Sequence, residues 1–168
     1  SIVAFADDVE LASIVFWTFG DVGRTNWRNL LLLVIIIIIG LIYFIYQSWN
    51  YNILAAGDET ALSLGVKVKK VRLSAMLVSS LLTALVVSFV GIIGFIGLVT
   101  PHIVRRIIGG DEKYLITAAG LAGSILLLTA DTVARTIIAP IILPVGILTS
   151  FLGAPLFIYL ILKGRKYW

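Results

Sequence analysis

The 168-residue chain is 60% hydrophobic and only 13% charged, and its mean hydropathy is +1.09. Water-soluble chains carry about 25% charged and about 45–50% apolar residues, so this composition excludes an ordinary soluble domain and predicts a lipid environment. With 0 Cys, a disulfide framework and a thiolate metal site are excluded. The net charge is +4, and the basic residues lie beside apolar runs instead of forming a nucleic-acid-binding patch.

The first 28 residues are predicted to lie on the outer side of the membrane. The segment Ala4–Phe19 is expected to form a short helix at the outer interface, because tryptophan side chains favour the headgroup layer. The chain opens as SIVAFADDVELASIVF, without the initiator Met, basic region or cleavage site of a signal peptide, and is expected to continue from a longer sequence. The acidic residues and tryptophans of this stretch are Asp7, Asp8, Glu10, Asp21, Trp17 and Trp27.

The first membrane-spanning helix is predicted over residues 29–46. No charged residue occurs from Asn29 to Gly57, and Leu30–Tyr46 is almost purely Leu, Val, Ile and aromatic residues. A hydrocarbon core about 30 Å thick needs roughly 20 helical residues. Lipid also forbids unpaired backbone groups, so helices are the expected spanning elements.

Three basic clusters set the predicted topology. If all three face the cytoplasm, as the positive-inside rule demands, the chain crosses the membrane an even number of times between successive clusters. Two helical hairpins result, 73–90 with 92–108 and 115–135 with 147–162, and the C-terminus is cytoplasmic. The expected fold is an all-α, multi-pass protein of the cell membrane with about five transmembrane helices. The clusters are Lys67, Lys69, Lys70 and Arg72; Arg105, Arg106 and Lys113; and Lys163, Arg165 and Lys166.

The returning helix of the first hairpin is predicted to be short or broken. Only about 30 residues separate Arg72 from Arg105, which is little for two crossings at about 1.5 Å per residue. A broken helix at membrane depth is tolerated where it faces protein or a water-filled path, so this stretch is a candidate translocation path. The alternative is that its small residues only let helices pack closely. The candidate residues at the break are Gly91, Gly94, Gly97, Pro101 and His102.

Two polar or irregular segments connect the spans. Pro140–Gly146, PIILPVG, is predicted to be the external turn before the last span. The segment from Asn52 to Arg72 is too polar for lipid, and its DETALSLG stretch is predicted to form a short amphipathic helix ended by Gly65. The alternative is an ordinary solvated loop. A compact helix at this place would be a rigid knob on the cytoplasmic side.

Several motifs, in order along the chain, resemble those of the FecCD-type permeases, which import iron chelates and cobalamin. GFIGLVTPHIVRR at Gly94–Arg106 is similar to the family signature GFIGLVxPHxxR. The resemblance continues through Ala130–Arg135 (ADTVAR), Leu143–Gly146 (LPVG) and Leu152–Pro155 (LGAP), and it includes the segment Trp17–Gly20 (WTFG) and Trp27 near the start. One departure is Ile142, where the family usually has Glu.

The resemblance implies the C-terminal half of a ten-helix permease and a set of partners. These partners are an ABC ATPase subunit, a substrate-binding protein outside the cell, and a second permease copy or the missing N-terminal half. The polar segment resembles the coupling segment that docks in a groove of the ATPase. The residues that this assigns to ATPase coupling are Asp58, Glu59, Ala61, Leu64 and Gly65.

Arg135 has two interpretations. It lies one helical turn from Asp131, so the two side chains can pair and reduce the cost of charge near lipid. The resemblance also places Arg135 where external arginines meet glutamates of the binding protein, and it makes Arg24 and Arg28 weaker candidates for that docking role.

No cofactor, metal site or catalytic group is expected. The sequence has no Gly-rich loop followed by Lys-Ser or Lys-Thr, so ATP hydrolysis is assigned to a partner and the chain to a transport subunit. His102 is the only histidine and cannot form a zinc site alone. The alternatives are a truncated or split half-permease that does not transport by itself, a small ion-coupled secondary transporter, and a membrane enzyme built around His102.

Overall fold

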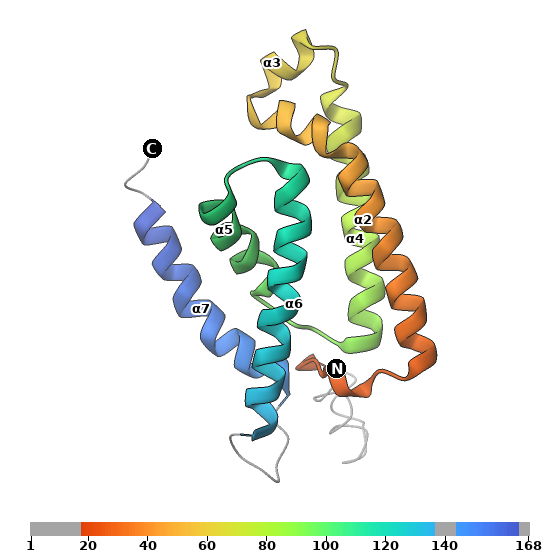
Figure 1. Cartoon of the computed structure of the whole chain (residues 1–168), viewed down its shortest axis with the longest axis vertical. Coiled ribbons are helices and arrows are strands. Elements are labelled where there is room, and N and C mark those ends of the chain that lie inside the picture. The colour runs from red at the N-terminus through yellow and green to blue at the C-terminus, as the bar shows by residue number, and fades with distance from the viewer. Residues whose placement is uncertain (1–17, 137–143, 165–168) are drawn as a thin grey trace, which may run out of the picture. The chain divides into compact units, whose positions relative to one another are not determined.

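A computed structural model describes residues 18–136 and 144–164, and the described residues are helices joined by short connections (Figure 1). The chain divides into two compact units. The first comprises residues 1–25, 87–99 and 123–168, and the second comprises residues 26–86 and 100–122. The elements are η2 (Val22–Arg24), α2 (Trp27–Ala55), α3 (Asp58–Ser63), α4 (Val68–Val90), α5 (Ile96–Ile108), α6 (Glu112–Thr136) and α7 (Val145–Gly164).

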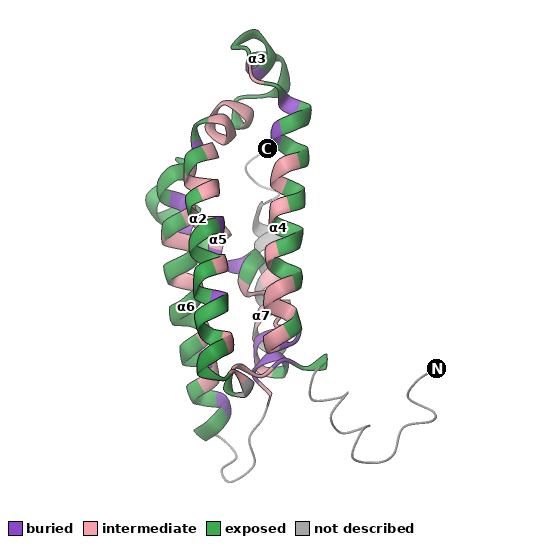
Figure 2. Cartoon of the chain, turned by 90° about the vertical axis from the view of Figure 1, so that its right-hand side faces the viewer, coloured by how far each residue is buried: buried purple, intermediate pink, exposed green. Residues whose placement is uncertain are grey.

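Three of the described helices, α2, α4 and α6, are long and apolar enough to cross a bilayer. In their most apolar stretches only 11%, 0% and 6% of the residues are buried inside the chain. Figure 2 shows this as long exposed surfaces on α2 and α4. Large apolar side chains such as Ile42 and Leu81, both 62% exposed, therefore need lipid or other helices to cover them.

α2 extends nine residues past the span predicted at 29–46. Its polar last turns stay helical because their side chains find partners within the helix: the Ser48 hydroxyl donates to the Ile45 carbonyl at 2.6 Å, and the Asn50 amide donates to Gln47 at 2.8 Å. The helix ends where Gly57 takes a φ of 108°. The polar segment predicted to start at Asn52 therefore begins inside this helix.

The other helices also differ from their predicted ranges, and the short α5 agrees with the expected short or broken helix. α5 has 13 residues, about 20 Å of helix at 1.5 Å per residue, which is short of a full crossing. Residues 91–95 between α4 and α5 are not helical, so the helix predicted over 92–108 begins only at Ile96. α4 starts five residues before the predicted Leu73, since its basic first turn is also helical.

In the second unit, α2 and α4 approach closely at Gly40. A Cβ atom there would lie 2.5 Å from a methyl group of Leu82, so the Leu82 side chain fills the space above the glycine. This is the close helix approach that small residues permit in membranes.

Two predicted segments fall wholly or partly outside the described residues. The external helix at Ala4–Phe19 is described only at its last two residues. Of the turn predicted at Pro140–Gly146, only Pro144, Val145 and Gly146 are described, and the prediction was wrong at its end: α7 already begins at Val145, directly after Pro144. Proline suits the start of a helix, where its missing N–H is not needed.

Candidate functional site

The polar segment between α2 and α4 contains α3, as the sequence predicted, and not an irregular loop (Figure 1). Asp58 and Glu59 lie in its first turn, where the helix dipole favours acidic groups. At its other end Gly65 has a φ of 81°, its N–H donates to the Leu62 carbonyl at 3.0 Å, and the Val66 N–H donates to the Ala61 carbonyl at 2.9 Å. This pair of bonds is a Schellman motif, and it needs the left-handed backbone that glycine adopts without strain.

α3 buries one side chain and presents the others to solvent. Ala61 is fully buried, which explains why a small residue stands there. Leu62 and Leu64 are 62% and 64% exposed, and Glu59 is also exposed. Two exposed leucines beside an acid, on a short helix with fixed ends, are typical of a surface that meets another protein.

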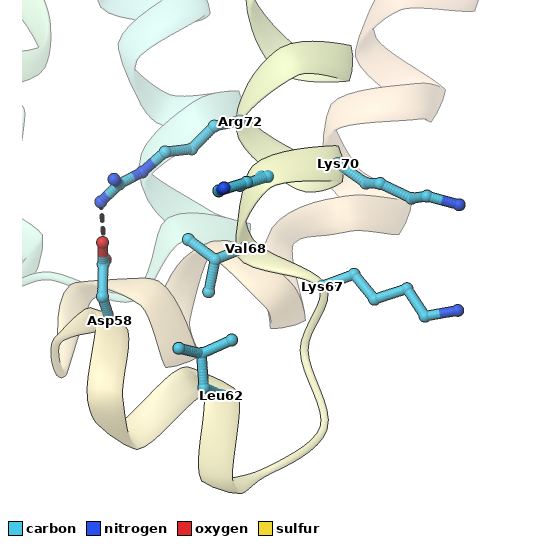
Figure 3. A pocket seen from close by; sticks show the side chains of 7 residues that line it. Asp58, Leu62, Lys67, Val68, Lys70 and Arg72 are labelled. Carbon is cyan, nitrogen blue, oxygen red and sulfur yellow. Dashed lines mark hydrogen bonds and ion pairs between the residues drawn. The ribbon is translucent and has the colours of Figure 1, made fainter.

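Asp58 forms an ion pair within the second unit. Its carboxylate accepts a hydrogen bond from the Arg72 guanidinium at 2.7 Å, so an ion pair ties the start of α3 to α4 (Figure 3). Both side chains are about half exposed, so the pair is worth little energy on its own. The bond shows that the start of α3 lies against the first turns of α4.

A second polar cluster joins the end of α2 to the start of α6. The Asn52 side-chain amide donates through its nitrogen to Asp111 at 3.0 Å, and its Oδ1 oxygen accepts the Glu112 N–H at 2.8 Å. Asp111 also accepts the Lys113 N–H at 3.0 Å and so caps α6. Asn52, Asp111 and Glu112 are called the clasp below. The sequence interpretation gave none of them a role, although an Asp after Gly109-Gly110 and before a helical pattern is an N-cap signal.

The hydrogen bonds of the clasp stabilise the ionised form of Asp111. The Asn52 amide, and then the Lys113 backbone N–H, hold the pKa of Asp111 below its usual range because both stabilise the carboxylate form. Arg105 near the end of α5 completes the group by donating to Glu112 at 2.6 Å. One cluster of the second unit thus joins α2, α5 and α6.

At the predicted break, three backbone segments of the first unit lie close together. The Asp21 N–H donates to the Val90 carbonyl at 2.9 Å. A Cβ atom on Gly20 would lie 2.5 Å from the Ile92 carbonyl oxygen, and one on Gly146 would overlap the Phe19 carbonyl oxygen. No side chain fits at either glycine, so the unwound segment 91–95 is held by backbone contacts.

Phe95 is the last residue of this segment and has a φ of 66°, the only positive value among the described residues other than glycine. Such a conformation costs a non-glycine residue about 1–3 kcal/mol and persists where the surroundings enforce it. Here α7 contributes: a Cβ atom on Gly153 would overlap the Cβ of Phe95, so the glycine leaves room for the phenylalanine.

The residues predicted at the break separate into two groups. Gly94 lies in the unwound segment. A Cβ atom on this glycine would lie 3.7 Å from the Ser150 hydroxyl oxygen. Gly97, Pro101 and His102 lie inside α5, so the helix break precedes Pro101 and does not include it. His102 is exposed, and no group of three or more metal-ligating side chains occurs among the described residues.

Arg135 pairs with Asp131, as the first of its two interpretations predicts. Its guanidinium donates to both carboxylate oxygens, at 2.8 and 3.2 Å, and lies 4.0 Å from Asp21. Asp21 in turn accepts the Gly23 N–H at 2.8 Å. The sequence interpretation missed Asp21 because the two residues are far apart in the chain. Arg135 is still 41% exposed at its side chain, so a further anion can reach it.

Comparison with known proteins gives a consistent result. The model of the FecCD transport family matches residues 1–163. A protein of Methanocaldococcus jannaschii that bears an ABC transporter permease name is 61% identical over 96% of the chain. The hemin transport system permease protein of Yersinia pestis is 44% identical, and the vitamin B12 import system permease protein of Vibrio vulnificus is 34% identical, each also over 96% of the chain.

A solved structure shares the fold. It shows an inward-facing conformation of a metal-chelate type ABC transporter, and it matches 96% of this chain at a TM-score of 0.87 and 33% identity. The match covers 52% of that structure's chain, and the three relatives are covered over 46–48% of their length. The chain therefore spans about half the length of the proteins it resembles.

Proposed function

The chain belongs to the FecCD transport family, and from that membership we propose that it is the C-terminal half of the permease of an ATP-driven importer for an iron chelate, haem or cobalamin. It is a multi-pass membrane protein and a transport subunit, and ATP hydrolysis belongs to a separate partner. The relatives named for hemin and for vitamin B12 support this range of cargo.

The observation that carries the proposal is α3. A rigid, exposed helix between α2 and α4 offers Glu59, Leu62 and Leu64 to a partner, and its ends are fixed by Gly57 and Gly65. Such a helix suits the groove of an ATPase subunit, because a knob must not deform if it is to transmit force. Ala61 and Gly65 then act through the shape of α3, and Asp58 through its bond to Arg72.

The contacts around α3 support a path for that force. Asp58 ties α3 to α4, and the clasp ties the end of α2 to the start of α6. When ATP closes two nucleotide-binding subunits, movement of α3 is passed to these helices of the second unit. Alternating access then follows from two packings of the helices that the partners bias differently.

The unwound segment 91–95, which includes Gly94, is proposed to border the translocation path. The α5 residues Gly97, Pro101 and His102 are proposed to border it as well. Non-helical backbone at membrane depth is tolerated beside protein or water, and Pro101 leaves the Gly97 carbonyl without its helical donor. The exposed His102 adds a polar side chain on the same short helix.

Arg135 is proposed to meet the substrate-binding protein outside the cell, with α3 and the C-terminus in the cytoplasm. The partial exposure of Arg135 supports this role, and its bonds to Asp131 keep the guanidinium oriented. The exposed apolar surfaces of α2 and α4 support a second permease copy or the missing N-terminal half as further partners. Until those helices are present, the half-permease is not expected to transport by itself.

The test is a pair of matched leucine substitutions. Leu64, the C-cap residue of α3, and Leu77 of α4 are 64% and 63% exposed, so Leu64→Ala and Leu77→Ala remove the same side chain from equally exposed sites. In the intact transporter, Leu64→Ala is expected to weaken co-purification of the ATPase about tenfold or more, as a contact residue buried in an interface does. Leu77→Ala is expected to leave it unchanged. Equal co-purification for both variants, with uptake intact, would rule out α3 as the coupling helix.

A further inference from the structure

A pocket of about 450 Å³ opens in the second unit between α3 and the first turns of α4 (Figure 3). It is lined by Asp58 and Leu62 of α3, and by residues 67–70 and Arg72 around the start of α4. Leu62 is 62% exposed and also belongs to the surface of α3 that is proposed to meet the ATPase. A partner that covers Leu62 therefore lies against the pocket as well.

The pocket carries an unbalanced positive charge. Arg72 is paired with Asp58 at 2.7 Å, which leaves the ammonium groups of three lysines. Within the described parts of the chain no carboxylate lies within ion-pair distance of Lys67, Lys69 or Lys70. Figure 3 shows Lys67 and Lys70 extending from the same side of the start of α4, away from the ion pair.

The lysines do not stabilise α4 itself. Lys69 and Lys70 lie in its first turn, where the helix dipole disfavours cations, and this turn contains no acidic residue. The backbone of the turn is already paired, since the Lys67 carbonyl accepts the N–H groups of Lys70 and Val71 at 2.9 and 3.1 Å. The positive-inside rule explains basic residues on this side of the membrane, but not their place around a pocket beside α3.

The apolar side of the pocket lies away from the bilayer. The span of α4 begins after Arg72, because residues 73–90 contain no charged side chain. Leu62 and Val68 lie on the side of Lys70 that is away from this span (Figure 3). Lipid tails therefore do not reach these two residues, and an occupant of the pocket comes from the aqueous side on which α3 lies.

We infer that Lys67 and Lys70 form ion pairs with carboxylates of the ATPase subunit beside the groove that receives α3, an inference that rests on the coupling role proposed for α3. When the ATPase covers Leu62, it also removes water from the neighbouring ammonium groups. A charge that loses water without gaining a partner is costly, so the ATPase surface must supply acids at this place.

The pocket thus defines the chemistry of the partner surface. The groove of the ATPase offers apolar side chains to Leu62 and Leu64, and acidic side chains stand at its edge opposite Lys67 and Lys70. An ATPase with a neutral or basic edge would leave the lysines unpaired and bind less well. The lysines therefore contribute to the choice of ATPase, whereas the shape of α3 transmits its movement.

The test compares two double substitutions that remove equal charge. Lys67→Gln with Lys70→Gln acts in the pocket, and Arg106→Gln with Lys113→Gln acts at exposed residues of α5 and α6 outside it. The intact permease is placed in nanodiscs of phosphatidylcholine alone, which has no net charge, and the affinity of its purified ATPase subunit is measured at low and high salt.

The pocket variant is expected to bind the ATPase about five- to tenfold more weakly at low salt. The difference should shrink at high salt, because exposed charges are screened. The control should change little. Lys67→Arg with Lys70→Arg keeps both charges and should keep most of the affinity.

Three results would overturn the inference. Equal loss in the pocket and control variants would mean that the general charge of this side attracts the ATPase. A loss of the same size at both salt concentrations would mean that the lysines maintain the shape of α4 and pair with no acid. Unchanged affinity in the pocket variant, with the expected loss in Leu64→Ala, would remove the ion pairs and leave the coupling role of α3 in place. The reverse result, a salt-dependent loss only in the pocket variant, would keep the ion pairs and remove that coupling role.

Discussion

At the scale of single residues, Arg135 shows how a charge near lipid is kept and also stays available. Its guanidinium is bound by both oxygens of Asp131, and a second carboxylate, Asp21, lies 4.0 Å away. Such a pair is favourable mainly because a lone charge at the end of a membrane helix is costly. The same pair fixes the direction of the guanidinium, so an anion on another protein meets it already oriented.

Two neutral substitutions separate the structural role of Arg135 from the docking role. If Arg135 docks the binding protein, Arg135→Gln should weaken binding several-fold at low salt, and the difference should shrink at high salt. Asp131→Asn keeps the cation and removes only the partner that orients it, so it should lower the affinity less than Arg135→Gln does. The measurement is the affinity of the binding protein for the transporter in nanodiscs at two salt concentrations. A similar loss in both variants would assign Arg135 to internal structure alone.

The sequence predicted the residues that act locally and missed those that act across the chain. The Asp131–Arg135 pair and the Gly65 cap follow from spacing along one helix, so they could be seen in the sequence. Asn52 and Asp21 could not, because their partners lie 59 and more than 100 positions away and only the packing of helices brings them together. A polar residue at the end of an apolar helix is the one signal that pointed to Asn52.

At the scale of elements, the ends of the helices were harder to predict than their existence. The sequence placed helices near all the described long elements, since apolar runs mark them clearly. α2 and α4 both continue into polar residues, because a helix ends where its backbone bonds lose partners and not where hydrophobicity ends. The break before α5 was expected from the short spacing of the basic clusters and from the glycines of that stretch, but its place at residues 91–95 also depends on Gly20, Gly146 and Gly153.

The clasp between α2 and α6 can be tested with one pair of asparagines. Asn52→Ala removes the side chain that receives the Glu112 N–H, whereas Asn50→Ala removes one that bonds only within α2, to Gln47. Hydrogen exchange of the Glu112 amide should rise about three- to tenfold in the first variant, as expected for the loss of one hydrogen bond. The second variant should leave it unchanged, and an equal rise in both would mean that the end of α2 merely frays.

The same experiment has a defined pH dependence. Because the folded pKa of Asp111 is lowered, its contribution is fully present above the ordinary carboxyl pKa of about 4 and is lost as the pH falls through the lower folded value. In the unsubstituted protein, the protection of the Lys113 amide from hydrogen exchange should therefore be the same at pH 5 and pH 8, and it should fall only in stronger acid. Asn52→Ala removes the largest cause of the shift, so its acid loss should begin at a higher pH.

At the scale of the whole molecule, the proposal depends on which face of the membrane each end occupies. The chain has 0 Cys, so single cysteines can report this directly. Ser63→Cys in α3 and Thr136→Cys at the end of α6 are both conservative and exposed. A membrane-impermeant maleimide added to intact spheroplasts should label position 136 and not position 63, and inverted vesicles should give the reverse. Labelling of both positions from one face would contradict the transport mechanism proposed above.

The clasp has a consequence for how the chain is made. All of its bonds lie between Asn52 and Leu115, whose N–H donates to the Asp111 carbonyl at 2.9 Å. As chains emerge from the ribosome with their N-terminal parts first, this contact can close while α7 is still being synthesised. The growing polypeptide then holds the end of α2 to the start of α6 before α7 packs against Phe95.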